Sequence, residues 1–169
     1  MPHELQECTM PFVKAKEGPP NYGSTIYTVQ YFDKKGNMFI RSDGSKAWRN
    51  NNPGNIVYTP RGFAAQHGAI GFAGDMAVFP NESTGRKALI ALLKSPGFKK
   101  LTISELPQQY DEHNADNYRR MLLSISKLEP NKVLKNLSPE EFKRLRLAIE
   151  RIEGWKEGSE VFVDKRYIS

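Results

Sequence analysis

The stretch SPEEFKRLRLAIERIEGW, residues 138–155, has the pattern of a long amphipathic helix. Ser138 is suited to cap its start, Pro139 fits the first helical position, and Glu141 completes a capping box. Gly154 predicts the end of the helix, because glycine readily adopts the conformation that follows a last helical turn. Between these signals, apolar residues recur at helical spacing: Phe142, Leu145, Ile149 and Ile152.

Working outward from this helix, the second half of the chain is helical in pattern and the first half is not. Helical spacing begins near Ser83, and Asn114 is a candidate cap for a helix with the apolar stripe Tyr118, Met121, Leu122, Ile125 and Leu128. Residues 25–32 and 38–41 predict a β-hairpin, and short apolar runs at 76–79 and 161–163 favour strands. Residues 46–80 are rich in Gly, Asn and Pro, and a long loop of that kind is usually functional.

These patterns predict one α+β domain over residues 25–169, mainly helical with a small N-terminal β-hairpin. Residues 1–24 carry four prolines and two glycines, so they are predicted to form an irregular arm. The single cysteine, Cys8, excludes an intrachain disulfide.

Glu153 is the candidate catalytic residue. It lies eleven residues after Phe142, so the two share nearly the same side of the helix, and the carboxylate is placed beside the apolar stripe. Loss of hydration and the nearby helix C-terminus would both raise its pKa, as a general acid requires. The alternative is a surface carboxylate that pairs with Lys156 or Arg151.

A second candidate region is the string WRNNNPGNI, residues 48–56. Trp48 could support a sugar ring, Arg49 could bind a carboxylate, and four asparagines offer donors and acceptors to a neutral polar ligand: Asn50, Asn51, Asn52 and Asn55. The same residues could instead form a rigid turn locked by side-chain hydrogen bonds. Weaker candidates for the rim of the site are His67, Asp111, Glu112 and Asn114, although a lone histidine is more often structural.

Composition limits the partners and cofactors. The net charge of +6 favours polyanions such as the bacterial wall or nucleic acid, but the basic residues are spread over several helices, so nucleic acid is not expected. The sequence has no nucleotide-binding glycine motif and no clustered metal ligands, which predicts no cofactor, with a surface calcium site left open. No apolar run suits a membrane span or a signal peptide.

The string Arg49–Ile56 resembles a family of bacterial and phage proteins that occur as virion-associated proteins and as type VI secretion effectors linked to peptidoglycan degradation. The resemblance extends over roughly residues 25–158 and rests on further motifs: Gly68–Gly71, Ala77–Pro80 with Gly85 and Ala88, Asp111–Asn114 with Tyr118, and Ile152–Trp155. The order helix, Glu153, Gly154 and then a strand is also similar to phage-type lysozymes.

These resemblances imply a lysozyme-like peptidoglycan hydrolase, a muramidase that cleaves glycan strands as an antibacterial toxin. They imply synthesis in the cytoplasm without a signal peptide, delivery by a secretion apparatus to the target periplasm, and a cognate immunity protein. The second catalytic carboxylate stays open between Asp33, Asp43 and Asp164. The alternatives are a Cys-His amidase using Cys8 with His67 or His113, and a non-catalytic virion or secretion module that binds the wall.

Overall fold

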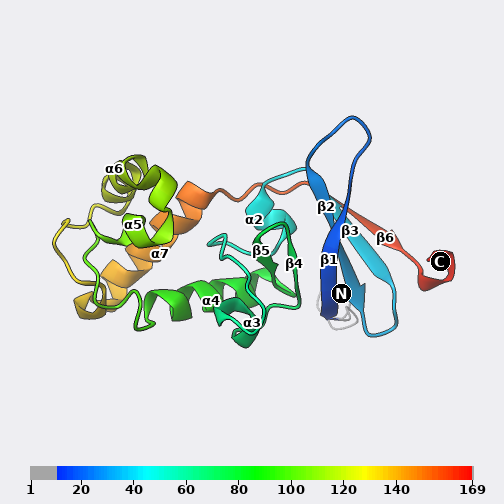
Figure 1. Cartoon of the computed structure of the whole chain (residues 1–169), viewed down its shortest axis with the longest axis horizontal. Coiled ribbons are helices and arrows are strands. Elements are labelled where there is room, and N and C mark those ends of the chain that lie inside the picture. Colours follow the sequence, from blue (N-terminus) through cyan, green and yellow to red (C-terminus); the bar gives the residue numbers. More distant parts are fainter. Residues whose placement is uncertain (1–10, 169) are drawn as a thin grey trace, which may run out of the picture.

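The computed structural model describes residues 11–168 and has an elongated shape. Figure 1 shows a helical body at one end and an antiparallel sheet at the other, with a short helix and a small two-stranded sheet between them. An extended segment leaves the last long helix and returns the chain to the sheet, so that the first and last strands belong to the same sheet.

The large sheet has four antiparallel strands in the order β1-β2-β3-β6. They are β1 (Phe12–Pro20), β2 (Tyr27–Asp33), β3 (Met38–Ser42) and β6 (Ser159–Val163). The predicted hairpin is confirmed as β2 and β3, and the predicted last strand as β6. Aromatic rings pack across the strands on one face of the sheet, with centroids 4.6 to 5.1 Å apart: Phe12, Tyr31, Phe39 and Phe162.

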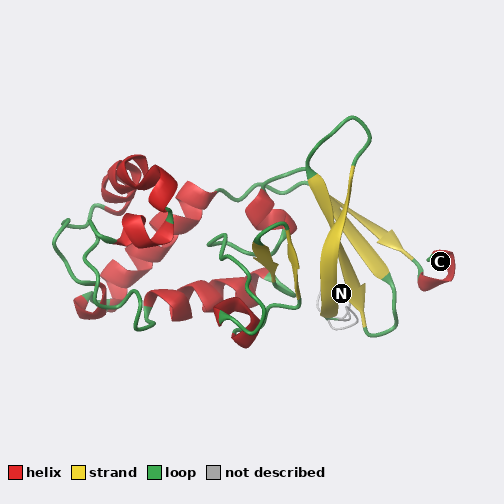
Figure 2. Cartoon of the chain, in the orientation of Figure 1, coloured by secondary structure: helices red, strands yellow, loops and turns green. Residues whose placement is uncertain are grey.

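The prediction of a mainly helical domain with a small hairpin is therefore wrong. Helices hold 39% of the described residues and strands 22%, and the fold is a sheet-rich α+β arrangement (Figure 2). The missing information was the pairing of β3 with β6, in which Phe39 lies opposite Phe162. That contact joins residues far apart in sequence, and local patterns do not report it.

The prediction of an irregular arm over residues 1–24 is wrong for Phe12–Pro20, which form β1. The prolines and glycines in this stretch indicated an irregular segment, so the strand was not predicted. Pro19 and Pro20 are tolerated because they lie at the end of an edge strand, where the ladder does not need every N–H. Gly18 is required by close packing, since a Cβ there would lie 2.4 Å from Oγ1 of Thr28. Residues 1–10, including Cys8, lie outside the described part.

The helical body is built from α4 (Glu82–Leu93), α5 (Leu106–Tyr110), α6 (Ala115–Ser126) and α7 (Pro139–Glu153), with the short 3-10 helices η1 (Glu112–Asn114) and η2 (Leu134–Asn136). Their apolar faces share one core that includes Leu89, Leu93, Ile103, Leu106, Leu122, Leu145 and Ile149. The predicted capping box at Ser138 is confirmed, and Gly154, with φ 86°, ends α7. Asn114 precedes α6 as predicted, but its side chain does not cap that helix.

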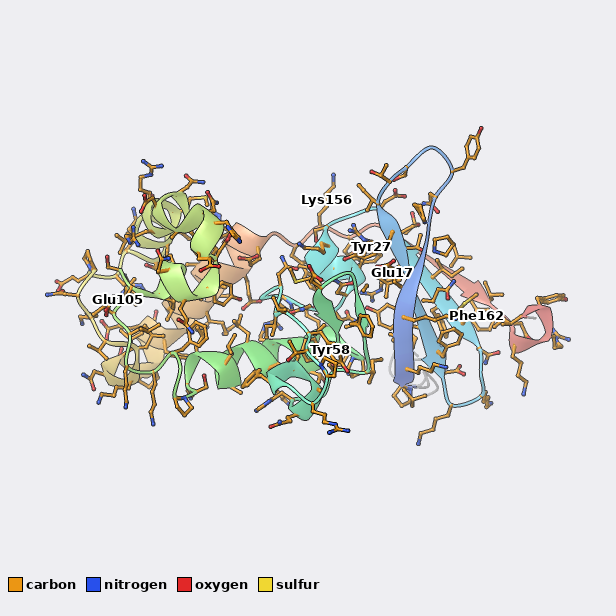
Figure 3. All side chains as sticks on the ribbon, viewed as in Figure 1. Glu17, Tyr27, Tyr58, Glu105, Lys156 and Phe162 are labelled. Carbon is orange, nitrogen blue, oxygen red and sulfur yellow. The ribbon has the colours of Figure 1, made fainter. Side chains whose placement is uncertain are left out.

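Residues 46–80, predicted as a loop, form a compact middle layer. It contains the one-turn helices α2 (Lys46–Arg49) and α3 (Phe63–Gln66) and the strands β4 (Gly71–Ala73) and β5 (Met76–Val78), the last matching the predicted short strand. The layer joins the large sheet through a small second core: Ala15, Val29, Tyr31, Ala73 and Val78. Glu17 of the sheet accepts a hydrogen bond from the backbone N–H of Gly74 at 2.7 Å, at the junction seen in Figure 3.

Within residues 11–168, no helix combines the length and the apolar character needed to cross a membrane.

Candidate functional site

Glu153, the last residue of α7, is half-buried, and both of its carboxylate oxygens are hydrogen-bonded. Oε1 accepts a bond from Nδ2 of Asn55 at 3.1 Å, and Oε2 accepts one from the hydroxyl of Tyr118 at 2.9 Å. The two donors come from the middle layer and from α6, so the carboxylate lies where three separate parts of the chain meet.

Burial raises the pKa of Glu153 above the ordinary value, and this is the largest influence on the group. The hydrogen bonds from Asn55 and Tyr118 oppose the shift, because they stabilise the charged form. The negative charge of Asp111 pushes the pKa upward again, and the positive charge of Lys46 opposes it. The net result is a carboxyl group that holds its proton to a higher pH than a free glutamate.

Glu153 lines an open cavity of about 480 Å³ between the middle layer and the helical body. Val57 and Met76 give this cavity an apolar wall. The polar lining is more extensive and comes from α2, the loop between α2 and α3, and the segment around η1: Lys46, Asn55, Gln109, Asp111, Glu112 and His113. Three carboxylates therefore face one lysine and one histidine, in a space large enough for a sugar or a peptide.

The floor of the site is held by Tyr110, whose hydroxyl donates a hydrogen bond to the carbonyl of Gly54. Gly54 has no room for a side chain, because a Cβ would lie 2.8 Å from both Leu89 and the Tyr110 hydroxyl. The next residue, Asn55, takes a left-handed backbone conformation with φ 48°, which asparagine tolerates better than most residues. This tight turn directs the Asn55 amide at Glu153.

Most of the 48–56 string is buried structure and does not line this cavity. Asn52 is fully buried, and its amide makes three hydrogen bonds, to the N–H and carbonyl of Ile56 at 2.9 Å each and to the carbonyl of Ala77 at 3.0 Å. Asn51 accepts a bond from Arg41 at 2.9 Å. The backbone carbonyl of Asn50 accepts the N–H of Phe79 at 2.9 Å, which ties the string to β5.

Arg49 and Trp48 are also occupied within the protein. The Nη1 of Arg49 donates to the carbonyls of Asp43 and Gly44 at 3.2 and 2.9 Å, so its guanidinium holds the chain that leads from the sheet. Trp48 is buried, with the guanidinium of Arg41 4.5 Å from its ring centroid. Side-chain hydrogen bonds hold the turn at Arg49, Asn51 and Asn52, whereas the buried side-chain amide of Asn50 has no hydrogen-bond partner among the described residues. Of the predicted binding residues from this string, only Asn55 reaches Glu153.

The remaining candidates divide between the cavity and the surface. Asp111 and Glu112, which were predicted as rim residues, line the cavity. His67 does not, because it is exposed at the end of α3, where its ring stacks on Phe63 with centroids 3.9 Å apart. Asn114 lies in a neighbouring surface depression that it shares with Glu112.

None of the three aspartates considered as a second carboxylate lines the cavity. Asp33 accepts hydrogen bonds within the β2–β3 turn, which lower its pKa, and Asp164 caps η3 (Lys165–Tyr167) near the C-terminus. Asp43 lies in a left-handed conformation with φ 59° before α2. Asp111 is the carboxylate whose charge acts on Glu153, and its distance from Glu153 along the sequence concealed that relation.

Sequence reasoning also missed the roles of two tyrosines. Tyr118 was expected as part of an apolar stripe and of a family motif, with no role assigned to its hydroxyl, yet that hydroxyl donates to the Glu153 carboxylate. The ring of Tyr110 packs against the ring of Tyr118, with centroids 5.8 Å apart. Buried tyrosine hydroxyls usually require a polar partner, which is the one signal that could have pointed to these contacts. The described residues contain no group of three or more His, Cys, Asp or Glu side chains suited to a metal ion.

Comparison of the chain with protein-family models and with curated proteins gave no match.

Replacing Tyr118 with Phe is expected to raise the pKa of Glu153 further. The substitution removes a donor that stabilises the charged carboxylate and leaves the ring packing in place. The pKa is measured by NMR titration of the Glu153 side-chain carboxyl carbon, with the exposed Tyr167→Phe as the control. An unchanged or lower pKa in Tyr118→Phe would contradict the contact as described.

Proposed function

We propose that this protein is a peptidoglycan hydrolase that cleaves glycan strands, with Glu153 as the general acid. The observation that carries the proposal is the half-buried Glu153 carboxyl, with a raised pKa, at the wall of a sugar-sized cavity. A carboxyl group that keeps its proton to a higher pH than a free glutamate can protonate the oxygen that leaves when a glycosidic bond breaks.

The proposed reaction needs a second carboxylate on the other side of the bond. Asp111 is our candidate, because it lines the same cavity and lies near enough for its charge to act on Glu153. Glu153 gives its proton to the leaving oxygen as the bond between that oxygen and the anomeric carbon breaks. Water attacks the same carbon, and its proton passes to Asp111. Asn55 and Tyr118 hold the Glu153 carboxyl in one orientation for the transfer.

The polar lining supports a carbohydrate ligand. Gln109 offers an amide donor and acceptor, as neutral sugar hydroxyls and acetamido groups require, and Val57 with Met76 offers an apolar surface for a ring. In this proposal the buried asparagines of the 48–52 stretch keep the cavity in shape and do not touch the substrate.

The proposal is tested by incubating the purified chain with purified sacculi and analysing the soluble products by mass spectrometry. We expect muropeptides with newly formed reducing sugar ends. Release of peptides from intact glycan would instead indicate amide cleavage, which is the chemistry of the Cys-His alternative. Tight binding to sacculi without any soluble product would replace the hydrolase with a wall-binding module.

We further propose that the protein acts on the wall of another bacterium, as a toxin delivered to its periplasm by a secretion apparatus. A hydrolase of this kind endangers the cell that makes it, so a cognate immunity protein is the expected partner. Expression with an added periplasmic signal in a sensitive cell should cause lysis, and expression without that signal should not.

A further inference from the structure

A second cavity, of about 510 Å³, lies at the opposite end of α7 from Glu153. It is open to solvent and is lined by the C-terminal half of α4, the segment around η2 and the first turn of α7, and it shares no lining residue with the Glu153 cavity. Six of its lining residues are apolar: Ile90, Leu93, Leu134, Leu137, Pro139 and Phe142. Cavities of this size and character usually hold small molecules with an apolar body.

Three lysines complete the lining: Lys94 at the end of α4, Lys99 in the loop that follows, and Lys135 in η2. The backbones of Lys99 and Lys135 are adjacent, because the backbone N–H of Lys135 donates to the carbonyl of Lys99 at 2.9 Å, and both residues line the cavity. Among residues 11–168, none of these three ammonium groups forms a salt bridge with a carboxylate.

The position of Lys94 has a structural explanation. It follows the last turn of α4, where a positive charge is favourable, and its ammonium lies 5.1 Å from the centre of the Phe142 ring. Lys99 and Lys135 have no comparable partner. Both lysines lie on the lining of an otherwise apolar cavity, so their positive charges favour an anionic ligand over a neutral or cationic one.

We propose that this cavity binds a fatty acid, with the alkyl chain against the apolar residues and the carboxylate between Lys99 and Lys135. A fatty acid satisfies both the apolar lining and the two lysines, because it carries an alkyl chain and a carboxylate in one molecule. A short anion would leave the apolar wall exposed to water, and an uncharged alkyl chain would leave the lysines unpaired. The site is independent of the proposed hydrolysis, because it lies at the other end of α7 and needs no residue of the Glu153 cavity.

The test uses NMR titration of the ¹⁵N-labelled chain with three probes: dodecanoate below its micelle concentration, butyrate with the same head group, and dodecyl maltoside with the same chain length and an uncharged head. We expect dodecanoate to shift the amide signals of residues around the cavity and to bind at least about tenfold more tightly than either other probe, since a charge-assisted contact and the burial of an alkyl chain are each worth that much.

A double variant, Lys99→Glu with Lys135→Glu, should weaken dodecanoate binding by about tenfold or more. The matched control is Lys34→Glu with Lys35→Glu, which changes the net charge by the same amount in the β2–β3 turn. Equal weakening in both double variants would reduce the effect to net charge and overturn the proposal. Comparable binding of dodecyl maltoside, or shifts confined to other parts of the chain, would also overturn it, and these wild-type results do not depend on any variant folding.

Discussion

Glu153→Gln is expected to lower the rate of muropeptide release from sacculi by about 100-fold or more, the usual contribution of a general acid. Glutamine has nearly the same shape, and its single side-chain oxygen can still accept from Asn55 while its amide N–H donates to the oxygen of the Tyr118 hydroxyl. It cannot deliver a proton. Loss of activity with little loss of stability would therefore assign the effect to proton transfer.

The matched control for this variant is Glu140→Gln, an exposed glutamate in the first turn of the same helix. It changes the net charge equally and should leave the rate unchanged. Thermal unfolding of both variants shows whether either has lost its fold. A folded Glu153→Gln protein with the wild-type rate would remove Glu153 from the chemistry and end the hydrolase proposal as stated.

The pH dependence of the wild-type rate should also show that Glu153 acts as a general acid. Burial raises the pKa of Glu153, so its protonated form persists to higher pH than that of an exposed glutamate. As an acid it is active when protonated, and the rate should therefore fall as the pH rises through this raised pKa. A rate that instead rose through that range would indicate that Glu153 acts as a base.

Asn52→Ala is expected to reduce the free energy of unfolding by about 3 kcal/mol, at roughly 1 kcal/mol for each of three lost hydrogen bonds. The Asn52 amide is fully buried and satisfies backbone groups of Ile56 and Ala77. Alanine would leave those groups unpaired beside the core, in a place that water does not reach. Urea denaturation monitored by circular dichroism measures the change.

Asn117→Ala is the control, because Asn117 is an exposed asparagine on α6. It should change the stability by less than about 0.5 kcal/mol, as expected for a surface substitution. A loss below about 1 kcal/mol in Asn52→Ala would contradict the structural role. If the variant stays fully stable and yet binds sacculi poorly, Asn52 belongs to the substrate site after all.

The positions of the site residues show why part of the site could be read from the sequence. Glu153 was singled out because its place relative to Phe142 depends only on the helical repeat of α7, and it lines the cavity. Asp111 and Glu112 were named as candidates for the rim, and they line the same cavity. Trp48, Arg49 and three asparagines were assigned to binding because they suit a sugar ring, a carboxylate and neutral polar groups, respectively. The side chains of Arg49 and Asn52 instead bind backbone carbonyls of the protein, because the same donors suit both kinds of partner.

What the sequence determined by itself is local. The start of α7 at Ser138, its end at Gly154, the β2–β3 hairpin and the apolar side of α6 each depend on residues within a few turns or one short loop. Such signals persist whatever surrounds them, because capping, turn geometry and helical spacing involve neighbours in the chain.

Only the tertiary structure decided that β6 completes the sheet and that Asn55 and Tyr118 meet at Glu153. The partners of Glu153 lie 98 and 35 residues away from it along the chain. Whether a polar side chain binds a substrate or a buried carbonyl depends on which distant segment packs against it. The partner of such a side chain is fixed only when the cores pack together, so a local sequence pattern does not predict it.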